Sequence, residues 1–179
     1  MPGASLEALT GRLGIGAIAF LGLFLIVDGA QAGAFQMIEL YGKSTTWGIV
    51  GVVPTAVVMY IVGVFCLGSV ELLVAPFAVF RGPDPEDILA VSRAGGAVVQ
   101  QLFSEYLRNH DLLKGAAVSF LILAVGSFAE FRNARGYESL VWLAGIAALA
   151  LSMLSLLFSR RAVAQSISLA KAVRAAAAA

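Results

Sequence analysis

Asp28 is the most conspicuous candidate for chemistry, because it is an acidic residue inside a long apolar run that also contains the amide Gln31. An ionised carboxylate deep in a bilayer costs about 2.5 to 3.5 kcal/mol on insertion scales. We therefore expect Asp28 to be paired, protonated or hydrated. The candidate partners are Thr55 and Ser127, at a similar height in other apolar runs, and Arg132, which would reach down from a polar turn.

Two interpretations of this acidic residue remain open from the sequence. Asp28 and Gln31 could form a proton or ion position, or part of a ring that lines a pore. Alternatively, Asp28 makes an interhelical hydrogen bond or extends its carboxylate toward the head groups. Glu71, in the second apolar run, is predicted to lie at the inner interface, where a glutamate needs no special explanation.

The single histidine and the single cysteine limit the enzyme chemistry that the chain can support. Cys66 can form no internal disulfide, and one histidine cannot provide a two-histidine haem or a histidine-rich metal site. A catalytic group built on His110, Asp111 and Lys114 would match no known spacing. A polar helix start near the head groups explains these three residues better, so we predict no enzyme activity, no metal and no cofactor.

Composition indicates that lipid is the solvent for most of this chain. Of its 179 residues, 60% are hydrophobic and 13% are charged, whereas a soluble domain carries about a quarter charged residues. One small core could not bury so much apolar surface. The net charge of +1 provides no basic field for nucleic acid. We expect one domain, residues 1–179, in a lipid bilayer.

The apolar runs predict an all-α polytopic membrane protein with four transmembrane helices. A helix needs about 20 residues to cross the hydrocarbon core. The predicted spans are about 13–33, 47–70, 114–131 and 139–158. The first run also resembles a secretory signal with a small-residue cleavage site, but its apolar stretch is longer than usual, so we expect a retained span.

An amphipathic linker helix is predicted at about 84–110, between spans two and three. It begins after Gly82 with capping and proline signals, and glycines at 95 and 96 weaken its centre. Apolar residues at three- and four-residue steps suggest a face for packing or for a partner protein. The predicted contact residues are Ile88, Val91, Val98, Leu102, Phe103 and Tyr106. Residues 160–179 are predicted to form a helical tail.

The distribution of basic residues predicts the orientation. With both termini inside, nine of the twelve Lys and Arg residues lie on the inner side of the four predicted spans. The positive-inside rule favours this arrangement. Aromatic residues near the outer ends, such as Tyr41, Trp47 and Trp142, are consistent with it. We expect an integral membrane protein of the bacterial inner membrane with cytoplasmic termini.

Small residues form steps along the first and last spans, which permits close helix contacts. Such contacts serve packing within one chain and assembly between chains equally well. The candidate contact residues are Gly29, Gly33, Ala144, Ala148 and Ser152.

These features support two functional hypotheses. The first is a non-catalytic membrane subunit that assembles with itself or with another membrane or cytoplasmic protein. The second is a homo-oligomeric ion channel or gated effector or sensor, such as those of stress or defence systems, with Asp28 near the conduction path.

Overall fold

The computed structural model describes residues 3–31, 45–74, 83–131, 133 and 136–178. Five α-helices make up these ranges, and no strand occurs within them. They are α1 (Gly3–Gln31), α3 (Thr45–Val74), α4 (Pro85–Ala94), α5 (Ala97–Glu130) and α6 (Glu138–Ala178). The prediction of an all-α fold is confirmed.

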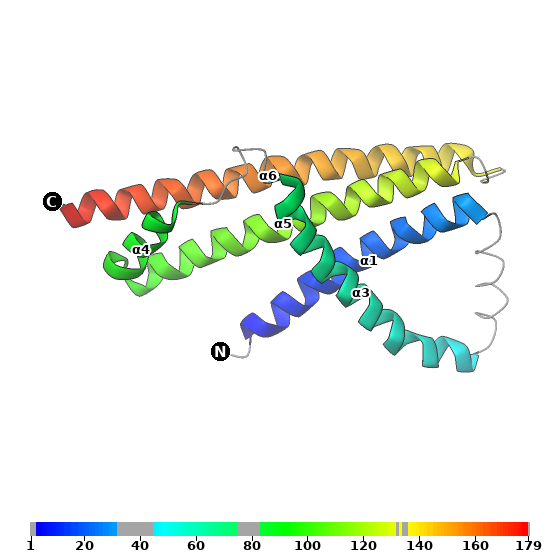
Figure 1. The fold of residues 1–179 in the computed structure, drawn as a ribbon, viewed down its shortest axis with the longest axis horizontal. Helices are drawn as coiled ribbons and strands as arrows, with labels where there is room; N and C mark the ends of the chain where they lie inside the picture. Colours follow the sequence, from blue (N-terminus) through cyan, green and yellow to red (C-terminus); the bar gives the residue numbers. More distant parts are fainter. Residues whose placement is uncertain (1–2, 32–44, 75–82, 132, 134–135, 179) are drawn as a thin grey trace.

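Three helices are long and apolar enough to cross a membrane: Leu9–Ala30 within α1, Ala97–Glu130 of α5 and Glu138–Ala177 of α6. The predicted second span lies in α3, whose described apolar part, Pro54–Val70, is shorter. The helix continues through Pro54. The N-terminus of α1 and the C-terminus of α6 lie toward the same end of the molecule, which we call the terminal end (Figure 1).

α5 and α6 form an antiparallel pair that is longer than a bilayer is thick. Their 34 and 41 residues correspond to about 50 and 60 Å, whereas a hydrocarbon core is about 30 Å thick. The pair runs side by side along most of its length (Figure 1). If it crosses a bilayer, it must therefore project well beyond it.

The predicted linker helix at 84–110 is two elements rather than one. α4 ends at Ala94, both glycines are extended, and α5 starts at Ala97 and continues without interruption to Glu130. Glycine favours such a break because it gains little from helical conformation. The predicted linker and third span are joined because no helix-ending signal separates residue 109 from residue 114.

α1 contacts both α3 and α5, and glycines allow both close approaches. At the crossing with α3, a Cβ on Gly16 would overlap the backbone of Met59, and one on Gly63 would overlap the backbone of Arg12. At the crossing with α5, a Cβ on Gly22 would lie 2.6 Å from the Cα of Leu123. Only glycine permits such backbone contacts, so these two crossings determine where α1 packs.

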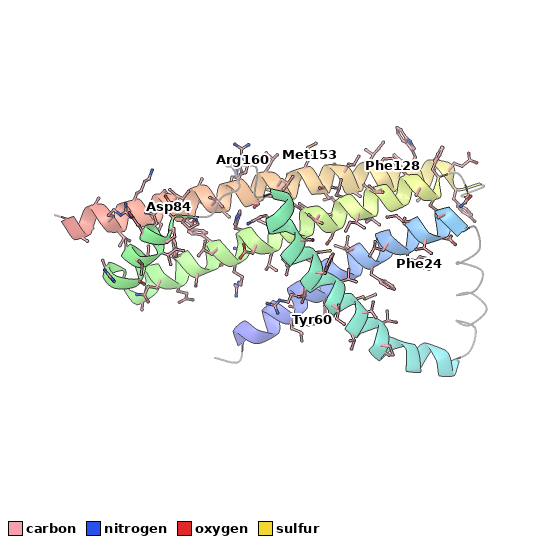
Figure 2. All side chains as sticks on the ribbon, viewed as in Figure 1. Phe24, Tyr60, Asp84, Phe128, Met153 and Arg160 are labelled. Atoms are coloured by element: carbon pink, nitrogen blue, oxygen red, sulfur yellow. The ribbon has the colours of Figure 1, made fainter. Side chains whose placement is uncertain are left out.

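A row of small side chains on α6 forms its contact with α5. Its members recur at steps of three and four residues, as expected for one face of a helix. This row, which we call the serine seam, comprises Gly145, Ala148, Ser152, Ser155, Ser159, Ala162 and Ser166, all of them buried. Met153 and Arg160 point away from α5, from the outer side of α6 (Figure 2). Small residues give the pair its close packing, since lipid provides no hydrophobic drive for helix association.

α4 packs against the C-terminal part of α6. Val91 of α4, Phe103 of α5 and Ala170 of α6 form one buried cluster. Arg174 adds ion pairs to Asp87 at 3.1 Å and to Glu86 at 3.6 Å. Because Arg174 and Glu86 are largely exposed, these ion pairs add little, and the apolar cluster holds α4 in place.

Candidate functional site

Asp28 and Glu130 bring two acidic side chains close together at the end of the bundle opposite the terminal end. Asp28 is 5% exposed on α1, and Glu130 is the last residue of α5. Two carboxylates at close range repel each other when both are ionised. The predicted acid therefore belongs to an intrachain carboxyl pair.

Asn133 connects the same region to the turn between α5 and α6. Its side-chain amide donates hydrogen bonds to the backbone carbonyls of Asp28, at 3.4 Å, and Gly29, at 3.1 Å. The last carbonyls of a helix lack partners within the helix. Asn133 therefore caps α1 and fixes the height of Asp28 relative to Glu130.

The residues predicted to lie near Asp28 are placed as follows. Ser127 is buried on α5, one turn before Glu130, and Thr55 is half-buried on α3. Arg132 and Gly33 lie outside the described residues. Gln31 ends α1 and Glu71 lies in the last turn of α3, but the side chains of both are outside the described part of the chain.

His110 and Ser159 form a buried polar contact between α5 and α6. The Nδ1 atom of His110 lies 2.7 Å from the Oγ and 3.2 Å from the carbonyl oxygen of Ser159. A serine hydroxyl beside an imidazole could form a nucleophile and base. Here His110 is 2% exposed and Ser159 is 0% exposed, so both side chains lie inside the helix interface. The pair instead satisfies two polar groups in the interface between the helices.

The other members of the proposed histidine group point elsewhere. Asp111 is exposed and pairs with Lys114 at 3.7 Å, on its own helix. The arrangement supports a structural role for His110.

Three of the predicted helix-contact residues lie within this chain's own interfaces. Gly29 lies against the backbone of Ala129 and Glu130. Ala148 is buried, and the hydroxyl of Ser152 donates a 2.8 Å hydrogen bond to the carbonyl of Ala117. Ala144, in contrast, is exposed.

The six predicted partner-contact residues separate into two groups. Val91 and Phe103 are buried against α6, and Tyr106 is half-buried. Ile88, Val98 and Leu102 are exposed, by 43%, 71% and 40%. α4 and α5 thus each contribute both buried and exposed members, so the chain covers only part of the predicted apolar stripe.

Sequence reasoning did not identify Glu130, Asn133 or the full serine seam. Glu130 was not singled out because it ends an apolar run, two residues before Arg132. An acidic residue at such a position is expected to lie at the membrane edge. The seam had a readable signal, since small residues at 145, 148, 152, 155, 159 and 162 follow a helical period.

The described residues contain no group of three or more metal-ligating side chains. No protein-family model matches the sequence, and neither curated proteins nor solved structures show a significant match to the chain.

Proposed function

We propose that this protein is a non-catalytic integral membrane subunit that assembles with a second copy or with another protein. In this proposal α1, α3, α5 and α6 are four membrane spans, in a bacterial inner membrane with cytoplasmic termini. The basic residues on the same side of the proposed last span as the C-terminus, such as Arg160 and Arg161, support the orientation. α4 and the adjoining ends of α5 and α6 then form a cytoplasmic projection.

The observation that carries the proposal is an exposed apolar surface on this projection. It consists of Ile88 and Leu89 on α4 and Val98 and Leu102 on α5, which are 40% to 71% exposed. We call it the projection surface. Lipid covers exposed apolar side chains on the spans, but it does not cover this projection. Several large apolar side chains exposed to water on one short projection favour a contact site.

The proposal predicts a particle heavier than one chain, and a loss of mass when the projection surface is made polar. We expect the purified protein in detergent to exceed the 18.6 kDa of a single chain. The double variant Val98→Ser/Leu102→Gln should reduce the particle to that mass, because it removes apolar contact area. Light scattering corrected for detergent measures both masses.

Gln101→Ser, an exposed polar position between the two, is the matched control and should keep the assembly. The helix content of each variant, measured by circular dichroism, distinguishes lost contact from lost fold. A lone wild-type chain would contradict assembly, and an assembly unchanged in the double variant would contradict the surface.

The carboxyl pair supports a second candidate function, an oligomeric ion or proton pathway. Asp28 and Glu130 lie close together in an apolar bundle, and intramembrane acids often mark such pathways. If the pair carries conduction, Asp28→Asn should abolish proton or cation leak from liposomes while the fold persists, because asparagine keeps the hydrogen bonds. Ala30→Asn, an exposed position on the same helix turn, is the control. A leak that Asp28→Asn leaves unchanged would eliminate this candidate.

A further inference from the structure

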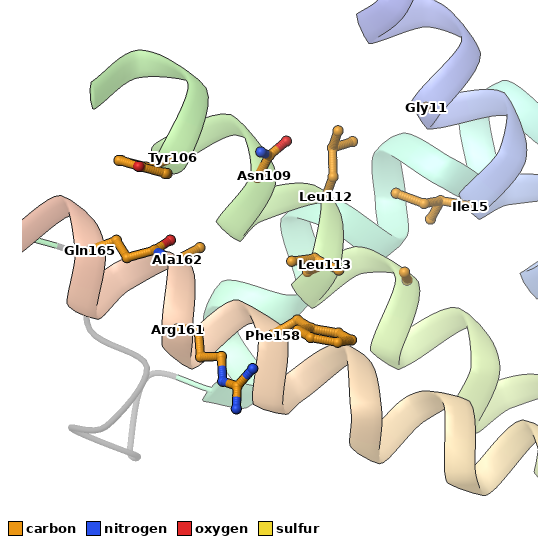
Figure 3. Close-up of a pocket in the computed structure, with 11 residues that line it drawn as sticks. Gly11, Ile15, Tyr106, Asn109, Leu112, Leu113, Phe158, Arg161, Ala162 and Gln165 are labelled. Atoms are coloured by element: carbon orange, nitrogen blue, oxygen red, sulfur yellow. The ribbon is translucent and has the colours of Figure 1, made fainter. Parts of the chain in front are cut away.

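An open pocket at the terminal end lies between α1, α5 and α6. Its volume is about 660 Å³, within the range of small-molecule sites. Figure 3 shows side chains from all three helices around it. The described lining residues are Gly11, Ile15, Tyr106, Asn109, Leu112, Leu113, Ala116, Phe158, Arg161, Ala162 and Gln165.

The lining changes from apolar to polar along the helix axes. Leu112 and Ala116 lie on the membrane side of Tyr106 and Asn109 along α5. On antiparallel α6, Phe158 lies on the membrane side of Arg161 and Gln165. The pocket is thus apolar toward the spans and polar toward the projection. This order matches a bilayer lipid, whose acyl chains lie along the spans and whose polar head group lies at the interface.

Arg161 places a positive charge at the polar end of the pocket. Its guanidinium carbon lies 5.9 Å from the centre of the Phe158 ring, a cation–π contact that holds the charge at the rim. Within the described ranges, Arg161 makes no ion pair, and no described lining residue is acidic. Asn109, Gln165 and Tyr106 add neutral hydrogen-bonding groups to the lining, while Arg161 extends from α6 at its edge (Figure 3). The polar end therefore favours a negatively charged group.

We propose that this pocket binds one anionic phospholipid, with an acyl chain against Leu112, Ala116 and Phe158 and the phosphate against Arg161. The level of the pocket favours a lipid over a soluble anion, because the polarity changes where the membrane spans meet the projection. The site is separate from the projection surface and does not depend on what binds there.

Lipid titration of the purified full chain tests the proposal. The delipidated protein in detergent is titrated with dioleoylphosphatidylglycerol or dioleoylphosphatidylcholine, and native mass spectrometry counts the bound lipids. We expect one phosphatidylglycerol to be retained in preference to phosphatidylcholine. Arg161→Ala should lower this occupancy about tenfold, because it removes a charge-assisted hydrogen bond to the phosphate. Arg161→Lys should retain part of it.

Arg160→Ala is the matched control, since it removes the same charge one residue away, on the outer side of α6 (Figure 2). It should change the occupancy by less than twofold. Gln165→Trp, at an exposed lining position, should obstruct the pocket and displace the lipid. Thermal unfolding of each variant shows whether the fold is intact.

Three results would overturn the proposal. Equal retention of the two lipids would show that the charge does not select the ligand. A loss in Arg160→Ala that equals or exceeds the loss in Arg161→Ala would indicate diffuse attraction or would assign the lipid to the neighbouring groove, which both arginines line. A dimer that Gln165→Trp dissociates, with no bound lipid, would assign the pocket to a second copy.

Discussion

Gly63→Leu will separate α3 from α1 and expose the buried cysteine. A Cβ at Gly63 would lie 3.0 Å from the backbone carbonyl carbon of Arg12 and 3.1 Å from the nitrogen of Gly16. Both are backbone atoms, so no side-chain rotation relieves the overlap. We expect a destabilisation of about 3 kcal/mol, at the upper end of the usual cost of overpacking.

Cys66 provides the measurement, because it is buried between α3 and α1 beside Ile15 and Ala19. A thiol-reactive fluorophore in detergent reports the temperature at which this side chain becomes accessible. In Gly63→Leu that temperature should fall strongly. The chain has one cysteine, so the signal has one source.

Gly68→Leu is the control on the same helix, since a Cβ there meets no atom within 4 Å. Gly14→Leu serves the same purpose on α1. Both should leave the accessibility transition of Cys66 near its wild-type temperature. Equal shifts in Gly63→Leu and Gly68→Leu would show that α1 and α3 do not cross at these glycines.

Ser159→Leu should open the serine seam between α5 and α6. Ser159 is completely buried and contacts the ring of His110. Leucine would add bulk where the helices are closest and would leave Nδ1 without its hydroxyl partner. We expect a loss of about 3 kcal/mol or more, from overpacking together with the lost hydrogen bond. Thermal unfolding followed by circular dichroism measures it.

Two further variants separate the causes of this loss. Ser159→Ala removes the hydrogen bond without adding bulk and should cost about 1 kcal/mol. Ser168→Leu makes the same substitution at an exposed position of α6 and should be nearly neutral. If Ser159→Leu proves as mild as Ser168→Leu, the contact between α5 and α6 does not run through this seam.

The helical class was predictable because it depends on composition and on apolar run length, which are local properties. The described part of the predicted first span lies in α1, and the predicted last span lies in α6, but α1 begins at Gly3 and α6 continues to Ala178. The predicted linker was wrong as a single helix, although Gly95 and Gly96 were visible as its weak point. Helix propensity identified the weak point at the two glycines, but it could not show that α5 continues through residues 109–114 into its apolar part.

The position of Asp28 was predictable, but its partner was not. An apolar run shows that an acid is buried, and it places the residue along the helix axis. It does not show which side of α1 faces α5, because the residues on all sides are apolar. Glu130 and Asn133 reach Asp28 through tertiary packing alone. Likewise, the sequence pattern gives Val91, Phe103 and Val98 the same predicted role. Only the packing of α4 and α5 against α6 shows that Val91 and Phe103 are buried.

The most direct test of the central claim is photo-crosslinking from the projection surface in intact membranes. A photoreactive phenylalanine at Val98, which is 71% exposed, should form an adduct with a second polypeptide chain. The same probe at Val125, 52% exposed in the apolar part of α5, should react mainly with lipid. A protein adduct at position 98 that disappears with Leu102→Gln is the result expected of a membrane subunit. If the probe at position 98 forms no protein adduct in membranes that contain the folded chain, the result contradicts the account.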